Sequence, residues 1–222
     1  DLNGNKLWTR QLGTSRSDIA HGVARDSSNN IYVTGETRGG MDNNTNFGDK
    51  DIFLVKYNAD GERQWTQQFG TDKEDAGYGI TVVSNFSFVT GLTYGALTGT
   101  NKGSSDIFLL KFNNNLTGSI DSIKQLGTAS EDVAYGLTAD SSGHIYITGY
   151  TKGNPWDVTG NPDNETNLGN TDAFILKYYD NLTLHWTELL GTASAEVGRS
   201  VTADSTNLYL TGDNSRSEER RV

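Results

Sequence analysis

Hydrophobic and polar side chains alternate over short stretches that recur along the whole chain. Residues 65–70 (WTQQFG) alternate large apolar with polar side chains, and residues 144–149 (HIYITG) alternate β-branched with aromatic ones. These stretches are rich in Val, Ile, Thr, Tyr and Phe and are bounded by Gly, Asn, Asp and Ser, as β-strands are. No window sustains a helical period. The pattern therefore predicts an all-β protein.

The strand-like stretches belong to a repeat. A Gly-Thr pair recurs at spacings of 57, 57 and 64 residues, and a Thr-Gly pair closes an apolar run at spacings of 56, 58 and 63. A D-x-F-x-x-K run appears at residues 51–57, 106–112 and 172–178. A Trp stands five residues before the Gly of three Gly-Thr pairs, whereas Ser122 replaces it in the remaining copy. Each unit holds four candidate strands, which is the content of one β-propeller blade.

The combined pattern resembles a known family of repeats. Residues 8–14 read WTRQLGT, residues 18–26 DIAHGVARD, residues 30–35 NIYVTG and residues 51–57 DIFLVKY. This order is similar to the SBBP family of bacterial β-propeller repeats, and the resemblance extends over residues 1–212. It implies four-stranded blades in which the strand at 18–26 is innermost and the Trp-bearing strand outermost. It also implies a large secreted or cell-surface bacterial protein, and it carries over no catalytic residues.

The repeat divides the chain into about three and a half blades of a β-propeller. We expect one outer strand, three complete blades and half a blade, at residues 1–13, 14–70, 71–127, 128–191 and 192–212. The last unit lacks its third strand, so the two ends could not complete one blade between them. We therefore expect an open fragment of a larger propeller, with the signal peptide outside this fragment.

Residues 213–222 form a tail without a counterpart in the other copies. Residues 216–222 read RSEERRV, which matches an in-frame translation of a common sequencing-adapter sequence. The alternative is a genuine charged, solvated tail. In either case we assign the tail no function.

Composition excludes several classes of function. The chain holds 18 Lys and Arg against 28 Asp and Glu, a net charge of −10, which argues against a nucleic-acid partner. Its lack of Cys excludes disulfides and Cys-ligated metals, and no apolar run is long enough for membrane insertion. The three His residues occupy different positions in the repeat, and no nucleophile elbow or phosphate-binding loop is present.

Departures from the repeat indicate where a ligand would bind. The second-to-third connections at residues 36–50, 92–105 and 150–171 are long, differ from one another, and emerge on the same face as the outer-to-inner connections. Long, varied loops on a rigid face are a common place for binding. The candidate ligand-binding aromatics in these loops are Trp156, Tyr94 and Phe47.

An acidic residue stands five positions after the Gly of each Gly-Thr pair, just before the inner strand: Asp18, Asp75, Asp132 and Glu196. Repetition in every copy favours a turn role, in which each carboxylate accepts hydrogen bonds from backbone N–H groups. The alternative is a cation-attracting, ligand-binding ring at the mouth of the central channel.

Two of the long loops share an oxygen-rich spacing that suits Ca²⁺, a cation that binds several hard oxygen ligands from flexible loops. The candidate ligands are Asp42, Asn44, Asn46 and Asp51 in one loop and Asp163, Glu165, Asn167 and Asp172 in the other. The spacing is not that of an EF-hand, and the middle loop is poorer in carboxylates. The alternative is a solvated polar loop. No cofactor is required, and Ca²⁺ is the candidate metal.

The leading hypothesis is a non-enzymatic interaction module of a secreted or cell-surface bacterial protein, which binds a protein or a glycan through the loops of one face. The runner-up is a propeller glycosidase or lyase that uses channel-mouth acids such as Asp75 and Asp132. A third hypothesis is a purely architectural segment of a long surface protein.

Overall fold

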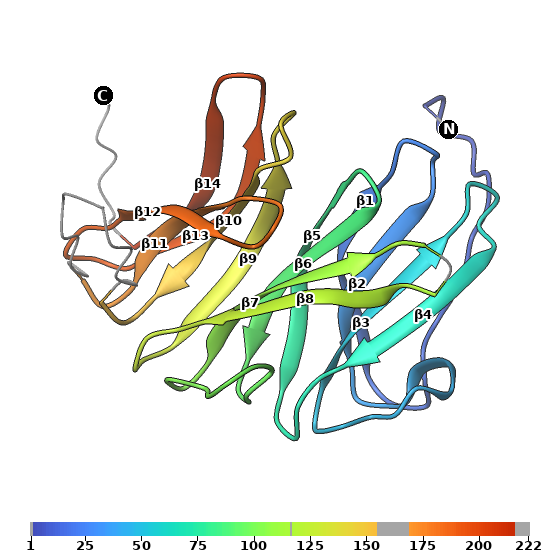
Figure 1. The fold of residues 1–222 in the computed structure, drawn as a ribbon, viewed down its shortest axis with the longest axis horizontal. Coiled ribbons are helices and arrows are strands. Elements are labelled where there is room, and N and C mark those ends of the chain that lie inside the picture. Colours follow the sequence, from blue (N-terminus) through green and yellow to red (C-terminus); the bar gives the residue numbers. More distant parts are fainter. Residues whose placement is uncertain (1, 116, 155–168, 216–222) are drawn as a thin grey trace.

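The computed structural model describes residues 2–115, 117–154 and 169–215. These residues form antiparallel sheets that stand side by side, three with four strands each and one with two (Figure 1). The strands of blade 1 are β1 (Asp18–Arg25), β2 (Ile31–Thr37), β3 (Asp51–Tyr57) and β4 (Arg63–Phe69). Those of blade 2 are β5 (Asp75–Val83), β6 (Phe86–Thr93), β7 (Asp106–Asn113) and β8 (Ser119–Leu126). Those of blade 3 are β9 (Asp132–Ala139), β10 (Ile145–Thr151), β11 (Asp172–Tyr178) and β12 (Leu184–Leu190). The fourth unit holds β13 (Glu196–Ala203) and β14 (Leu208–Asn214).

The order of strands confirms the predicted all-β propeller fold. In each complete blade the strands pair in chain order, from the inner strand that follows Gly-Thr to the outer strand that precedes the next Gly-Thr. The inner strands β1, β5, β9 and β13 contact one another in succession, so the blades are arranged around a common inner wall. The described residues form an open array and do not close into a ring.

The two ends of the repeat differ from the predicted boundaries. Residues 6–13 form no strand in the described chain, because no third strand lies beside them to pair with. They contact blade 1 instead: Trp8 Nε1 donates to the Ala59 carbonyl at 3.1 Å, and Arg10 Nε donates to the Gly61 carbonyl at 2.6 Å. At the other end β14 continues through Asn214, two residues past the predicted end of the half blade. Residues 216–222 lie outside the described residues.

The hydrophobic cores lie between blades, and this explains the apolar D-x-F-x-x-K run. Side chains alternate across a strand. In β7, Ile107 and Leu109 pack toward blade 3 in a core with Phe174 and Leu176. On the opposite face of the same strand, Phe108, Leu110 and Phe112 pack toward blade 1 in a core with Tyr32, Ile52 and Leu54. A strand buried on both faces reads as a nearly continuous apolar run.

The other face of blade 1 carries an apolar hollow of about 340 Å³ between the sheet and residues 8–12. Met41, Phe53, Val55 and Tyr57 form the floor. At the junction of blades 1 and 2 the equivalent space is filled by Tyr32, Ile52 and Leu54 of the preceding blade. The hollow is thus a blade-packing surface by analogy with the rest of the chain.

Candidate functional site

One face of the propeller collects the long connections. The starts of the inner and third strands pair with the end of the second strand, for example Asp18 and Asp51 with Thr37. The second-to-third and outer-to-inner connections therefore emerge together, at the lower edge of Figure 1. We call this surface the loop face; its described residues are 13–17, 38–50, 70–74, 94–105, 127–131, 152–154, 169–171 and 191–195.

The four repeated acids lie inside the turns of the loop face. Each accepts a hydrogen bond from the backbone N–H of the Thr four residues earlier: Asp18 at 2.6 Å, Asp75 at 2.5 Å, Asp132 at 2.6 Å and Glu196 at 2.9 Å. Asp75 and Asp132 are completely buried. This geometry is the turn role that the repetition favours. It offers no support for the alternative, a ring of acids open to ligands.

The Gly of each Gly-Thr pair lies against an acid, either at the start of an inner strand (Asp18, Asp75) or at the start of a third strand (Asp51, Asp106, Asp172). A Cβ on Gly70 would lie 2.5 Å from Asp51 Oδ1 and 3.0 Å from Asp75 Oδ2, so any larger residue would displace two buried carboxylates. Burial raises the pKa of Asp75, and the nearby charge of Asp51 raises it further. Burial likewise raises the pKa of Asp132, where the additional charge is that of Asp106. Each complete junction between blades therefore holds a closely spaced pair of buried acids.

The candidate Ca²⁺ ligands of the first loop interact with other residues. Asp42 accepts hydrogen bonds from Arg63 and Thr66, and Asp51 Oδ2 accepts from Phe47 N and Gln68 Nε2, both at 2.8 Å. The amide groups of the two asparagines donate to backbone carbonyls, Asn44 to Met41 at 2.8 Å and Asn46 to Gly48 at 3.1 Å.

In the second loop, Asp163, Glu165 and Asn167 lie outside the described residues, and Asp172 is buried at the start of β11. Among the residues that the structure describes, no three acidic or His side chains are grouped as a metal site would need. Calcium binding stays a prediction.

Two of the three predicted aromatics lie exposed on the loop face. Phe47 is 54% exposed and Tyr94 is 39% exposed. Trp156 lies outside the described residues.

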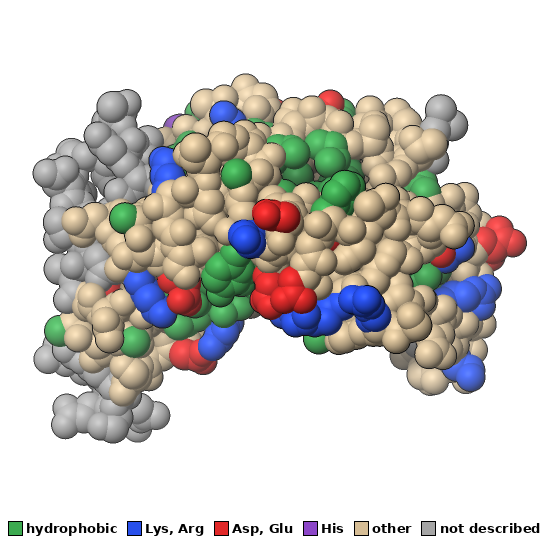
Figure 2. Space-filling model, turned by 90° about the horizontal axis from the view of Figure 1, so that it is seen from below, with side chains coloured by type: hydrophobic (Ala, Val, Ile, Leu, Met, Phe, Trp, Pro, Cys, Tyr) green, Lys and Arg blue, Asp and Glu red, His purple; other side chains and the backbone are tan. Residues whose placement is uncertain are grey.

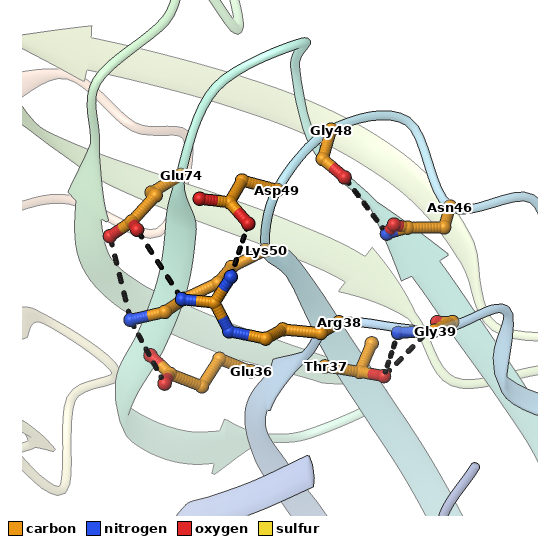
Figure 3. A network of polar contacts seen from close by, with 9 residues as sticks. All are labelled: Glu36, Thr37, Arg38, Gly39, Asn46, Gly48, Asp49, Lys50 and Glu74. Atoms are coloured by element: carbon orange, nitrogen blue, oxygen red, sulfur yellow. Dashed lines mark hydrogen bonds and ion pairs between the residues drawn. The ribbon is translucent and has the colours of Figure 1, made fainter. Parts of the chain in front are cut away.

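A network of charged side chains joins blades 1 and 2 at the loop face (Figure 3). Lys50 Nζ lies 3.3 Å from Glu36 Oε1 and 3.4 Å from Glu74 Oε2. Arg38 contacts Glu74 at 3.6 Å and also pairs with Asp49. The hydrogen bond from His21 and the positive charge of Lys50 lower the pKa of Glu36. These side chains therefore form a patch in which each charge is paired with an opposite one.

A second cluster continues the patch toward blade 3. Glu131 accepts a hydrogen bond from the Tyr150 hydroxyl and pairs with Lys152 at 3.2 Å. The Tyr150 hydrogen bond is the main cause that lowers the pKa of Glu131. Seen from the loop face, basic and acidic side chains lie beside one another next to hydrophobic ones (Figure 2).

The sequence carries a signal for these two clusters that lies outside its repeated motifs. Glu74 and Glu131 each stand just before a repeated inner-strand acid, where the other copies have Ser17 and Ala195. Three residues after the Thr-Gly glycine, the copies have Arg38, Tyr94, Lys152 and Ser215. Positions that vary between copies while their neighbours repeat therefore gather on one surface.

Comparison with known families identifies the repeat. A family model described as a beta-propeller repeat, SBBP, matches residues 7–40 and 123–156. Both matched segments run from an outer strand position through an inner strand and a second strand, so they cover equivalent parts of two units. No curated protein matches the chain. Within the described residues, no helix is long and apolar enough to cross a membrane. The matched segments and the blade architecture agree: residues 7–40 and 123–156 are SBBP β-propeller repeats, set in a chain of four-stranded blades.

Proposed function

We propose that this propeller is a non-catalytic interaction module of a secreted or cell-surface bacterial protein, and that its loop face binds a protein or a glycan. One observation carries the proposal: the side chains that depart from the repeat gather on the loop face. They include the exposed rings of Phe47 and Tyr94 and the charged clusters around Glu74 and Glu131. Function on repeat proteins is grafted on such variable positions.

The opposite face supports the proposal by contrast. Its turns are short, and an Asp repeats the same role in three of them. Asp26 accepts from Asn30 N at 2.8 Å, Asp140 accepts from His144 N at 3.0 Å, and Asp204 accepts from Asn207 N at 2.7 Å. These three turns repeat one structural solution, unlike the connections of the loop face.

The placement of the acids supports a non-catalytic role. A glycosidase needs two carboxylates that face one glycosidic bond, about 5–10 Å apart. Asp75 and Asp132, the acids of the runner-up hypothesis, are buried and bonded within their own turns. A cell-surface protein that only binds would need no such pair.

The test compares loop-face and control variants of the full chain on arrays of glycans and of surface proteins. We expect Phe47→Ala, Tyr94→Ala and Trp156→Ala to weaken binding roughly tenfold or more, as the loss of aromatic hot spots does. Tyr209→Ala is the matched control, because Tyr209 is a 53% exposed ring at the other end of a strand. Binding that survives all three loop variants contradicts the proposal.

A further inference from the structure

Each inner strand carries a β-bulge at the same place. The pairing register with the second strand shifts between Ala20 and Gly22 in β1, and the same shift occurs in the other three units. A bulge leaves one residue out of the ladder and re-aims its side chain. The residues left out are His21, Tyr78, Tyr135 and Arg199. We call these four residues the bulge ladder.

The bulge ladder forms a continuous row across the inner wall. The rings of His21 and Tyr78 meet edge to face with centroids 4.8 Å apart, and those of Tyr78 and Tyr135 lie 5.4 Å apart. The Arg199 guanidinium lies over Tyr135 at 4.8 Å from the ring centroid. Since the inner strands succeed one another along the wall, the row crosses all four units.

The chemistry of the bulge ladder varies where its surroundings are constant. An Ala or Gly precedes each of the four residues, and a Gly follows three of them. The bulged residues themselves are imidazole, phenol, phenol and guanidinium. They are also partly exposed, unlike the buried rings between blades. The core position of Phe53, Phe108 and Phe174, by contrast, keeps one residue type in all three complete blades.

The two end members of the ladder each lie beside an acid. His21 Nε2 lies 3.8 Å from Glu36 Oε2, and Arg199 Nε donates to Asp213 Oδ2 at 2.7 Å. The row therefore presents aromatic surface with donors and acceptors but little net charge. The net charge of −10 repels the phosphate backbone of a nucleic acid, which argues against nucleic-acid bases as the stacking partner. A neutral sugar chain fits best, because its apolar ring faces pack on aromatic side chains and its hydroxyls both donate and accept hydrogen bonds.

We propose that the bulge ladder binds a neutral oligosaccharide that lies across the inner wall. This inference rests on the proposed interaction function and adds a second binding surface, the inner wall, with its own ligand class and contact residues. Tyr78 and Tyr135 are the stacking platforms, and His21 and Arg199 with their acid partners bind hydroxyls at the two ends.

The test is isothermal titration of the full chain with neutral hexasaccharides: cellohexaose, xylohexaose, mannohexaose and chitohexaose. We expect at least one to bind, with Tyr78→Ala and Tyr135→Ala each weakening it roughly tenfold or more. Tyr78→Phe keeps the ring and should retain most of the affinity. Tyr209→Ala is the matched control. Tyr135→Leu, which keeps apolar bulk, replaces Tyr135→Ala if circular dichroism shows that the latter unfolds.

Three results would overturn the inference: no binding of any neutral hexasaccharide, binding only of polygalacturonate or of a peptide, or binding that the Tyr78 and Tyr135 variants leave unchanged. Failure of the inference is distinguishable from failure of the proposed function. A hexasaccharide whose binding is lost in Tyr94→Ala but unchanged in the Tyr78 and Tyr135 variants, which is the third of these results, would refute the ladder and retain the loop face. A chain that binds nothing on either array would refute both.

Discussion

The junctions of blades 1 with 2 and of blades 2 with 3 solve one packing problem in opposite ways. At the first, Trp65 of β4 packs over Gly118 in the β7–β8 turn, where an added Cβ would lie 2.8 Å from the indole. At the second, Ser122 takes the position of Trp65, and Leu182 in the β11–β12 turn takes the position of Gly118. Both turn residues have positive φ, 69° and 62°. The large side chain has moved from the earlier blade to the later one.

The difference indicates that the outer-strand position and the facing position in the next blade's turn are coupled. Leu182 is buried in the core with Phe88 and Leu109 of blade 2, so it fills its junction from the other side. A left-handed conformation costs a non-Gly residue about 1–2 kcal/mol, and burying a Leu contributes about 1.5–3 kcal/mol. Burial of Leu182 therefore offsets the conformational cost. Residues 6–13 repeat the first solution, since Trp8 packs over Gly61. A Trp in the outer strand therefore occurs with a Gly in the facing turn, and a Ser in the outer strand occurs with a Leu in that turn.

The largest effect should come from removing the indole at the first junction. We expect Trp65→Ala to lower the free energy of unfolding by about 3–5 kcal/mol, the cost of truncating a buried aromatic residue. Trp186→Ala is the control: both Trp rings lie near a Tyr, at 6.1 Å and 6.2 Å, but Trp186 is only partly buried. Urea denaturation measures both. Equal losses would show that the turn of the next blade contributes nothing.

Exchanging the second junction for the first should show coupling. We expect Ser122→Trp to destabilise the chain because Leu182 occupies the space, and Leu182→Gly to destabilise it through a cavity. The double variant should recover about 0.5–3 kcal/mol relative to the sum of the single changes. A double-mutant cycle in urea measures this. Simple additivity would mean that the two positions are independent.

The buried acids at the two junctions predict a pH effect. The pKa of Asp75 is raised in the folded chain, so the folded state takes up its proton at a higher pH than the unfolded state. Stability from this group therefore rises as pH falls from neutral through the folded pKa, and the gain is complete at the unfolded pKa. Melting temperatures across this range should show a smaller gain in Asp75→Asn than in the wild type. Asp132→Asn should behave in the same way. Unchanged profiles in both variants would refute the buried-acid interpretation.

The smallest expected effect concerns the ion pairs of the first junction. Lys50 lies against Glu36 and Glu74, whereas at the second junction the equivalent Ser105 donates to the Asp132 carbonyl at 3.1 Å. Partly exposed pairs are worth about 1 kcal/mol or less and weaken in salt. We expect Lys50→Ala to cost about that much at low ionic strength and less at high ionic strength. A loss that salt does not reduce would point to packing instead.

The sequence predicted the blades better than the contacts between them. The D-x-F-x-x-K run and the Gly-Thr spacing give strand order directly, because each strand is short and bounded by turn residues. The partnership of Ser122 with Leu182 was hidden, since two extra residues in the β7–β8 turn shift the alignment of Gly118. The bulge ladder was hidden as well. A bulge changes which face a side chain occupies, and strict alternation cannot reveal that change.

The third strand of blade 2, β7, affects how readily this blade separates from its neighbours. Since β7 is a wall common to two cores, blade 2 cannot detach without exposing apolar surface on both sides. The fourth unit contacts only one neighbour and has no such strand among the described residues. Stability in such a stack depends on nearest-neighbour terms, so a unit packed against one neighbour opens more readily than a unit packed against two. Among the described residues, β13 and β14 should therefore open before blade 2 does.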